Sequence, residues 1–171
     1  MKTKIFLISA PIVLILIGVI MDKTRDNIWF QQSTKIACDI ENVNRSIGNL
    51  GEHYKNLISV YPGMTTIELI EHGDDYVSIK TSEGLMKRTN FSVLKSENRI
   101  VIEFDEEYIT SKLTTTSHFV ENFEAKADTV ELDITISNIT APGFLGFFLR
   151  NFGGKSIGNA FLNSYKTILE K

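Results

Sequence analysis

The fold is decided by the C-terminal stretch APGFLGFFLRNFGGKSIGNAFLNSYKTILEK, residues 141–171. In its second half, Ile157, Phe161, Tyr165 and Ile168 recur at helical spacing, and polar residues fall between them. This pattern predicts a long helix with one apolar stripe along a polar rod. Such a stripe needs a large apolar surface to cover it, so the rest of the chain must supply one.

The first half of the same stretch, residues 144–152, carries too many aromatic side chains for an ordinary solvated helix. Three interpretations stay open for it. The segment can plug the sheet as the buried start of the helix, or line or gate an apolar cavity beside its glycines. It can also touch a lipid bilayer through Phe144, Phe147 and Phe148, with Arg150. A glycine pair at 153–154 separates the two halves and permits a kink.

Upstream of this helix, most segments show the alternation of a half-buried strand and are separated by turn signals. The predicted strands are residues 32–40, 64–71, 76–81, 85–94, 99–105, 112–123 and 129–139. Between the first two, residues 41–60 change to helical spacing, which Gly48 and Gly51 interrupt, so two short helices are predicted. Residues 105–111 are polar and acidic, and we expect a loop or an irregular edge there.

This order of elements predicts an α+β fold, in which an antiparallel sheet curls around the C-terminal helix. The 171 residues suit one domain with an appendage. We place a membrane anchor and linker at residues 1–27 and the folded domain at residues 28–171.

The appendage is an uncharged run, residues 5–21, which follows two lysines. A helix of about 17 residues is the shortest that spans a bilayer. No small-residue cleavage site follows the run, so we predict a retained single-pass transmembrane helix with the domain on the extracytoplasmic side. A signal peptide that is removed and a buried core helix are the alternatives.

Composition and spacing argue against several other functions. A net charge of −3 without a basic stripe argues against a nucleic-acid partner. The single cysteine, Cys38, allows no intramolecular disulfide and is expected to be buried. The three histidines lack the close spacing of a metal site, and no glycine loop for a phosphate cofactor is present. Neither a metal nor a cofactor is therefore predicted.

An acidic run lies at residues 103–107, where Glu103, Asp105, Glu106 and Glu107 follow one another closely. It lacks the glycine and the spaced ligands of a calcium loop. We therefore interpret it as a solvated edge.

The order of elements over residues 32–171 resembles the START/Bet v 1-like (SRPBCC) superfamily. The segment GLMKRTNF at 84–91 and the tail at 145–170, which ends in SYKTILE, are similar to its polyketide cyclase/dehydrase and lipid-transport branch. The resemblance implies a helix-grip fold, in which a seven-stranded antiparallel sheet grips the terminal helix. It also implies a hydrophobic cavity between them for lipids, sterols, quinones or polyketides.

Sequence and resemblance together predict a domain that binds a hydrophobic small molecule or lipid. The expected ligand contacts are Arg88, Phe104, His118, Phe144, Phe148, Phe161 and Tyr165. For His118, a position in the cavity and a position on the outer strand face both stay open. The alternatives are a cyclase or dehydratase acting on a polyketide-like substrate, for which no catalytic residue is evident, and a structural envelope module without a ligand.

Overall fold

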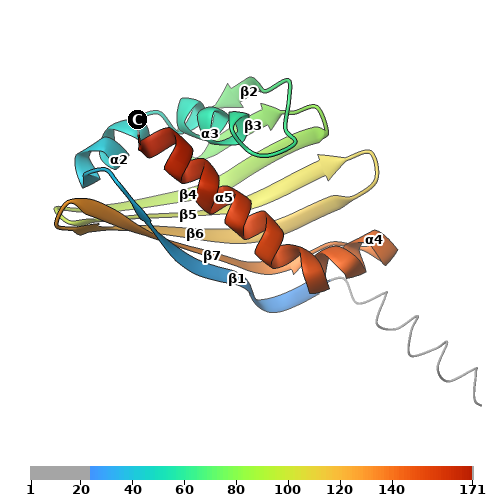
Figure 1. The fold of residues 1–171 in the computed structure, drawn as a ribbon. Coiled ribbons are helices and arrows are strands. Elements are labelled where there is room, and N and C mark those ends of the chain that lie inside the picture. The colour runs from blue at the N-terminus through green and yellow to red at the C-terminus, as the bar shows by residue number, and fades with distance from the viewer. Residues whose placement is uncertain (1–23, 171) are drawn as a thin grey trace, which may run out of the picture.

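The computed structural model describes residues 24–170, with side chains from Asn27 onward. Seven strands form one antiparallel sheet in the order β1-β7-β6-β5-β4-β3-β2. Figure 1 shows the sheet curved around α5, the long C-terminal helix. The strands are β1 (Thr24–Ile36), β2 (Glu68–His72), β3 (Tyr76–Lys80), β4 (Gly84–Ser96), β5 (Arg99–Thr110), β6 (Thr114–Lys126) and β7 (Thr129–Thr140).

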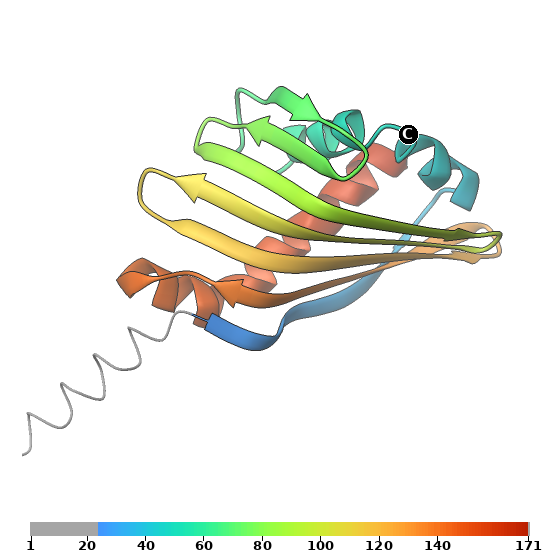
Figure 2. The ribbon, with the colours of Figure 1, turned by 180° about the vertical axis from the view of Figure 1, so that it is seen from behind.

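The helices lie between the first two strands and at the C-terminus. They are α2 (Ile40–Ser46), α3 (Leu50–Ser59), α4 (Gly143–Phe148), the π-helical turn η1 (Leu149–Gly153) and α5 (Gly154–Leu169). Seen from behind, the strands lie in front of α5, so this helix covers one face of the sheet (Figure 2). The predicted α+β fold with its seven-stranded sheet and C-terminal helix is confirmed.

The sheet is open, with β1 and β2 at its edges, and it brings the first and last strands in sequence together. Strands β2 to β7 follow one another as hairpins, whereas β1 pairs with β7, with Thr24 opposite Thr140. Bulges in β4 and β7 bend the sheet, and Asn90 and Asn138, which lie at these bulges, have positive φ angles of 58° and 54°. Such bulges increase the local twist of a strand, which lets a sheet wrap a helix.

The core lies between the concave face of the sheet and the apolar stripe of α5. Phe161 and Tyr165 of the predicted stripe are buried, and so are Leu162 and Leu169 beside them. Ile157 and Ile168, at the two ends of the stripe, are half-buried. Every second residue of β7 from Val130 to Ile136 is fully buried beneath the helix. The helix also approaches β1 closely, because a side chain at Gly158 would collide with the Phe30 ring. Cys38 is buried, as predicted.

Several strand boundaries differ from prediction, and two of the differences affect the site. The first strand begins at Thr24 and ends at Ile36, and Asp39 then caps α2 by accepting a hydrogen bond from the Asn42 amide. The predicted loop at 105–111 is wrong, because β5 continues through it to Thr110, paired with β4 and β6 on both sides. Pairing with two neighbouring strands holds this polar segment in extended conformation.

The predicted membrane helix at residues 5–21 lies outside the described residues. From Thr24 to Glu170, no helix is both long and apolar enough to cross a bilayer.

Candidate functional site

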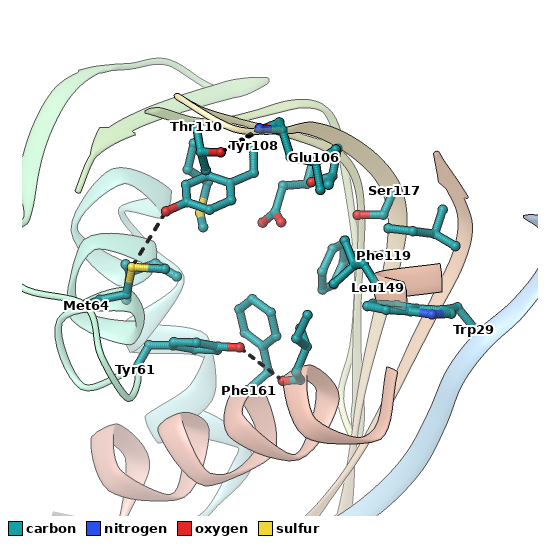
Figure 3. A pocket seen from close by; sticks show the side chains of 16 residues that line it. Trp29, Tyr61, Met64, Glu106, Tyr108, Thr110, Ser117, Phe119, Leu149 and Phe161 are labelled. Carbon is teal, nitrogen blue, oxygen red and sulfur yellow. Dashed lines mark hydrogen bonds between the residues drawn. The ribbon is translucent and has the colours of Figure 1, made fainter. Parts of the chain in front are cut away.

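A half-open cavity of about 260 Å³ lies between α5 and the concave face of the sheet. It is near the end of the molecule where η1 joins α5. Most of its wall is apolar, with Trp29, Met86, Phe119, Leu149 and Phe161 among the lining residues. Figure 3 shows lining side chains that converge from three parts of the fold: Phe119 from the strands, Tyr61 and Met64 from the loop before β2, and Phe161 from the helix.

Three polar side chains of this wall matter for its chemistry. The Tyr108 hydroxyl lies 3.1 Å from Thr81 Oγ1, and the Tyr61 hydroxyl donates a hydrogen bond to the Ile157 carbonyl at 3.5 Å. Both phenols therefore already have partners. The third, the Glu106 carboxylate, points from β5 towards the middle of the cavity (Figure 3).

Behind the cavity wall, Glu106 forms an ion pair with Arg88, which is fully buried. Glu106 Oε2 accepts a hydrogen bond from Arg88 Nε at 2.8 Å, and it lies 2.7 Å from Arg88 Nη2. Burial, the largest single effect, lowers the pKa of the guanidinium, but the charge of Glu106 together with the nearby Tyr54, Glu121 and Tyr165 outweighs burial, so the pKa is raised. The arginine therefore stays charged inside the core.

Aromatic rings surround the same guanidinium. Its central carbon lies 4.3 Å from the centroid of Tyr54 and 4.7 Å from that of Phe104, and the rings of Phe119 and Phe161 lie within 6 Å. The electron-rich faces of these rings attract the cation. Because Nη1 has no hydrogen-bond acceptor among residues 24–170, the rings take over part of the stabilisation that water would give.

A second buried carboxylate, Glu121 of β6, lies deeper in the core. Its Oε2 accepts hydrogen bonds from the hydroxyls of Tyr54 at 2.9 Å and Tyr165 at 2.6 Å. Burial raises the pKa of Glu121 to about 7, although Arg88 opposes the shift. Glu121 therefore changes charge near neutral pH.

The network continues from Tyr165 to α3. Its hydroxyl lies 3.4 Å from His53 Nε2, and His53 Nδ1 lies 2.8 Å from Ser46 Oγ. Burial, followed by the charge of Arg88, lowers the pKa of His53 to about 3. The imidazole is therefore neutral at physiological pH, as a histidine without a carboxylate partner in a core must be.

The residues expected to contact a ligand fall into three groups. Phe161 lines the cavity, whereas Arg88, Phe104 and Tyr165 are buried next to the lining residues. His118 lies on the outer face of β6, where its Nδ1 is 2.9 Å from Asp105 Oδ1.

The third group is Phe144 and Phe148, which are 61% and 47% exposed and are not among the residues that line the cavity. Their exposure excludes the interpretation that residues 144–152 plug the sheet as a whole. Within that segment Leu149 does line the cavity.

Sequence reasoning missed the two buried carboxylates. Glu106 was assigned to a solvated edge, but it is only 9% exposed. The signal was available, because the alternation of Ile102 and Phe104 continues in phase to Glu106. Glu121 likewise falls between Phe119 and Phe123 on the buried face of β6.

The chain is similar to known proteins in its fold and not in its sequence. No protein-family model matches this chain, and no curated protein matches it by sequence. An uncharacterized protein from Rhizobium leguminosarum superposes with a TM-score of 0.62 at 11% identity, over 86% of this chain and 96% of the other.

Two further solved structures have the same fold. A Chromobacterium violaceum protein superposes with a TM-score of 0.59 at 12% identity, over 88% of this chain and 99% of the other. A STAR-related lipid transfer protein from Xanthomonas axonopodis has a TM-score of 0.50 at 10% identity, over 82% of this chain and 85% of that fragment. At these identities the similarity establishes the helix-grip fold.

A double-mutant cycle on Arg88 and Glu106 measures the ion pair. Either Arg88→Met or Glu106→Gln leaves one buried charge without its partner, so each should lower the free energy of unfolding by about 3–5 kcal/mol. The double variant restores neutrality and should cost less than the sum, as urea denaturation would show. The exposed pair Lys87 and Glu107, one residue along the same strands, is the matched control and should couple by less than about 1 kcal/mol. Equal coupling in the two pairs would contradict this interpretation.

The variant Glu121→Gln tests the buried carboxyl through pH. Folded Glu121 holds its proton up to about pH 7, whereas the unfolded carboxyl releases it near 4.5, so its burial costs stability as pH rises between these values. Burial of neutral His53 lowers the free energy of unfolding as pH falls from 6.5 towards 3. Between pH 4.5 and 6.5, the two residues therefore change the free energy of unfolding with pH in opposite directions.

In the glutamine variant, the pH dependence that Glu121 contributes to the free energy of unfolding is lost, and that of His53 remains. Its free energy of unfolding, relative to wild type, should therefore rise with pH between 4.5 and 7 by about 1.4 kcal/mol per unit. Urea denaturation at several pH values measures this difference, with Glu97→Gln on an exposed turn as control. A difference that does not change with pH would mean that Glu121 is already ionised in the folded protein at pH 4.5.

Proposed function

We propose that this protein is a membrane-anchored member of the START/Bet v 1-like superfamily that holds one apolar molecule in the cavity beside α5. The observation that carries the proposal is a cavity with an apolar wall and one carboxylate, Glu106, facing its interior. Burying apolar ligand surface there would contribute about 25 cal/mol per Å². A few polar groups within an apolar wall are the usual composition of a small-molecule site.

The Glu106–Arg88 pair indicates what the polar end of the ligand is. Because Arg88 balances the charge of Glu106, the site does not require a cationic ligand. The carboxylate oxygen that does not face Arg88 can accept a hydrogen bond from a neutral donor. The ligand that fits is therefore an apolar molecule with one hydroxyl or amide N–H group.

The cavity volume also limits the ligand. Sites for drug-sized molecules usually measure about 300–1,000 Å³, and this cavity, at 260 Å³, is smaller. One acyl chain or a small ring system would fill it, and a larger lipid would leave its remainder at the opening.

The proposed anchor is the uncharged run at residues 5–21, which would hold the domain at the extracytoplasmic surface of a membrane. The fold similarity to a STAR-related lipid transfer protein supports an apolar ligand, and a tethered domain would exchange such a ligand with the lipid beside it.

Binding fits the cavity better than catalysis. An enzyme would need a proton donor and acceptor facing the substrate. Burial, followed by the charge of Glu106, raises the pKa of Tyr61 to about 12, which makes this phenol a poor acid. Glu121, whose pKa lies near neutrality, is not among the residues that line the cavity.

Filling the cavity should remove the ligand. Thr115 of β6 lines the cavity, and its neighbour Thr116 is exposed on the other face of the same strand. We expect Thr115→Phe to lose the apolar molecules that co-purify with the full chain, because the ring occupies their space. Organic extraction followed by mass spectrometry identifies these molecules.

The matched control is Thr116→Phe, which has the same anchor and the same added ring. Lipid that merely surrounds the anchor would be equal in the two variants, so the comparison isolates the cavity. Leu149→Trp fills the cavity from the helix and guards against misfolding of one variant. Identical extracts from wild type and both filled variants would refute a ligand in this cavity.

A further inference from the structure

Four apolar side chains are exposed together at the start of the C-terminal helical region. We call Phe144, Leu145, Phe148 and Phe152 the aromatic patch; they are 61%, 55%, 47% and 72% exposed. The Phe148 ring contacts those of Phe144 and Phe152, with centroids 4.9 and 6.0 Å apart. The patch is therefore one continuous surface over successive helical turns. Exposed apolar surface of this kind marks an interaction site.

The geometry points to a lipid bilayer as the partner of the aromatic patch. Residues 141–149 contain no polar side chain, and no aspartate or glutamate occurs between Asp133 and Glu170. Arg150, the one charged residue of α4 and η1, is buried and donates a hydrogen bond to the Ala141 carbonyl. The surface of this segment thus lacks the carboxylates that would resist insertion among lipid headgroups.

The position of the aromatic patch supports the same partner. The uncharged run ends at Met21, and two residues separate it from Thr24, a link that spans at most about 10 Å. Thr24 pairs with Thr140, and the chain then enters α4 at Gly143. An anchor in the bilayer would therefore hold α4 at the membrane surface. In this respect the inference rests on the proposed function.

The aromatic patch also adjoins the cavity. Leu149, which follows Phe148 directly, is a lining residue, and Trp29 beside it donates a hydrogen bond from Nε1 to the Arg150 carbonyl at 2.9 Å. Seating α4 and η1 in the bilayer would bring the cavity next to the lipid phase. An apolar molecule could then pass between cavity and membrane with little exposure to water.

Site-directed spin labelling of the full chain tests this contact. In a Cys38→Ala background, a nitroxide is placed at Phe152→Cys or at Leu94→Cys, and the protein is reconstituted in vesicles of phosphatidylcholine with some phosphatidylglycerol. Leu94 is the matched control, because it is a 65% exposed leucine outside the aromatic patch. We expect the label at 152 to be reached by oxygen, which partitions into lipid, several-fold better than by a water-soluble nickel chelate, and the label at 94 to show the reverse.

Each other result overturns the inference. A label at 152 that the nickel chelate reaches freely means that the aromatic patch faces water. A label shielded from both reagents means that another part of the chain covers the patch, and spin–spin broadening means that a second copy does.

Vesicle flotation and alkaline extraction separate this inference from the anchor. A chain that resists extraction but has a water-exposed label keeps its anchor and loses the aromatic patch contact. A chain that is extracted, yet floats at neutral pH unless Phe144, Phe148 and Phe152 are changed to serine, retains the patch and overturns the anchor. A chain that is extracted and does not float with vesicles overturns both the anchor and the contact of the aromatic patch with lipid. The serine changes lie at exposed positions and should leave the urea denaturation midpoint unchanged.

Discussion

The interior of this domain is organised around one buried cation. Arg88 carries its charge inside an otherwise apolar core, which is costly unless a counter-charge and suitable contacts surround it. Glu106 supplies the counter-charge from the neighbouring strand, and rings from α3, the sheet and α5 enclose the guanidinium. The pair thus connects the sheet with α3 and α5, and its carboxylate also faces the cavity.

The second carboxylate has a different partner set and a different charge. Two tyrosine hydroxyls hold Glu121, one from α3 and one from α5, so the network fixes both helices against the sheet. Its pKa lies near 7, and the pKa of the adjacent His53 lies near 3. At neutral pH the polar core therefore holds one firm ion pair, a neutral histidine and a carboxyl that is only partly ionised. The ion pair lies at the cavity, whereas Glu121 is not among the residues that line it.

Much of the fold could be predicted from sequence, and much of the site could not. The period of the C-terminal stretch and the alternation of the strands predicted the sheet and its helix, because burial on one face leaves a regular pattern. The sequence points to Arg88 and Phe161 as candidates, but the three acidic neighbours of Glu106 make it resemble a surface residue. Which acidic residue faces inward depends on the alternation of inward and outward side chains along β5. The predicted loop at 105–111 ended that alternation before Glu106. The exposure of Phe144 could not be predicted, since nothing in composition distinguishes a core aromatic from a surface one.

The pairing of the first strand with the last has a consequence for biosynthesis. β1 leaves the ribosome first, yet its only neighbour in the sheet, β7, is made near the end of the chain. Until β7 is made, β1 has no partner strand, and pairings between distant segments form slowly. We therefore expect folding to be largely post-translational. The hairpins from β2 to β7 should form first, and β1 should pair with β7 last.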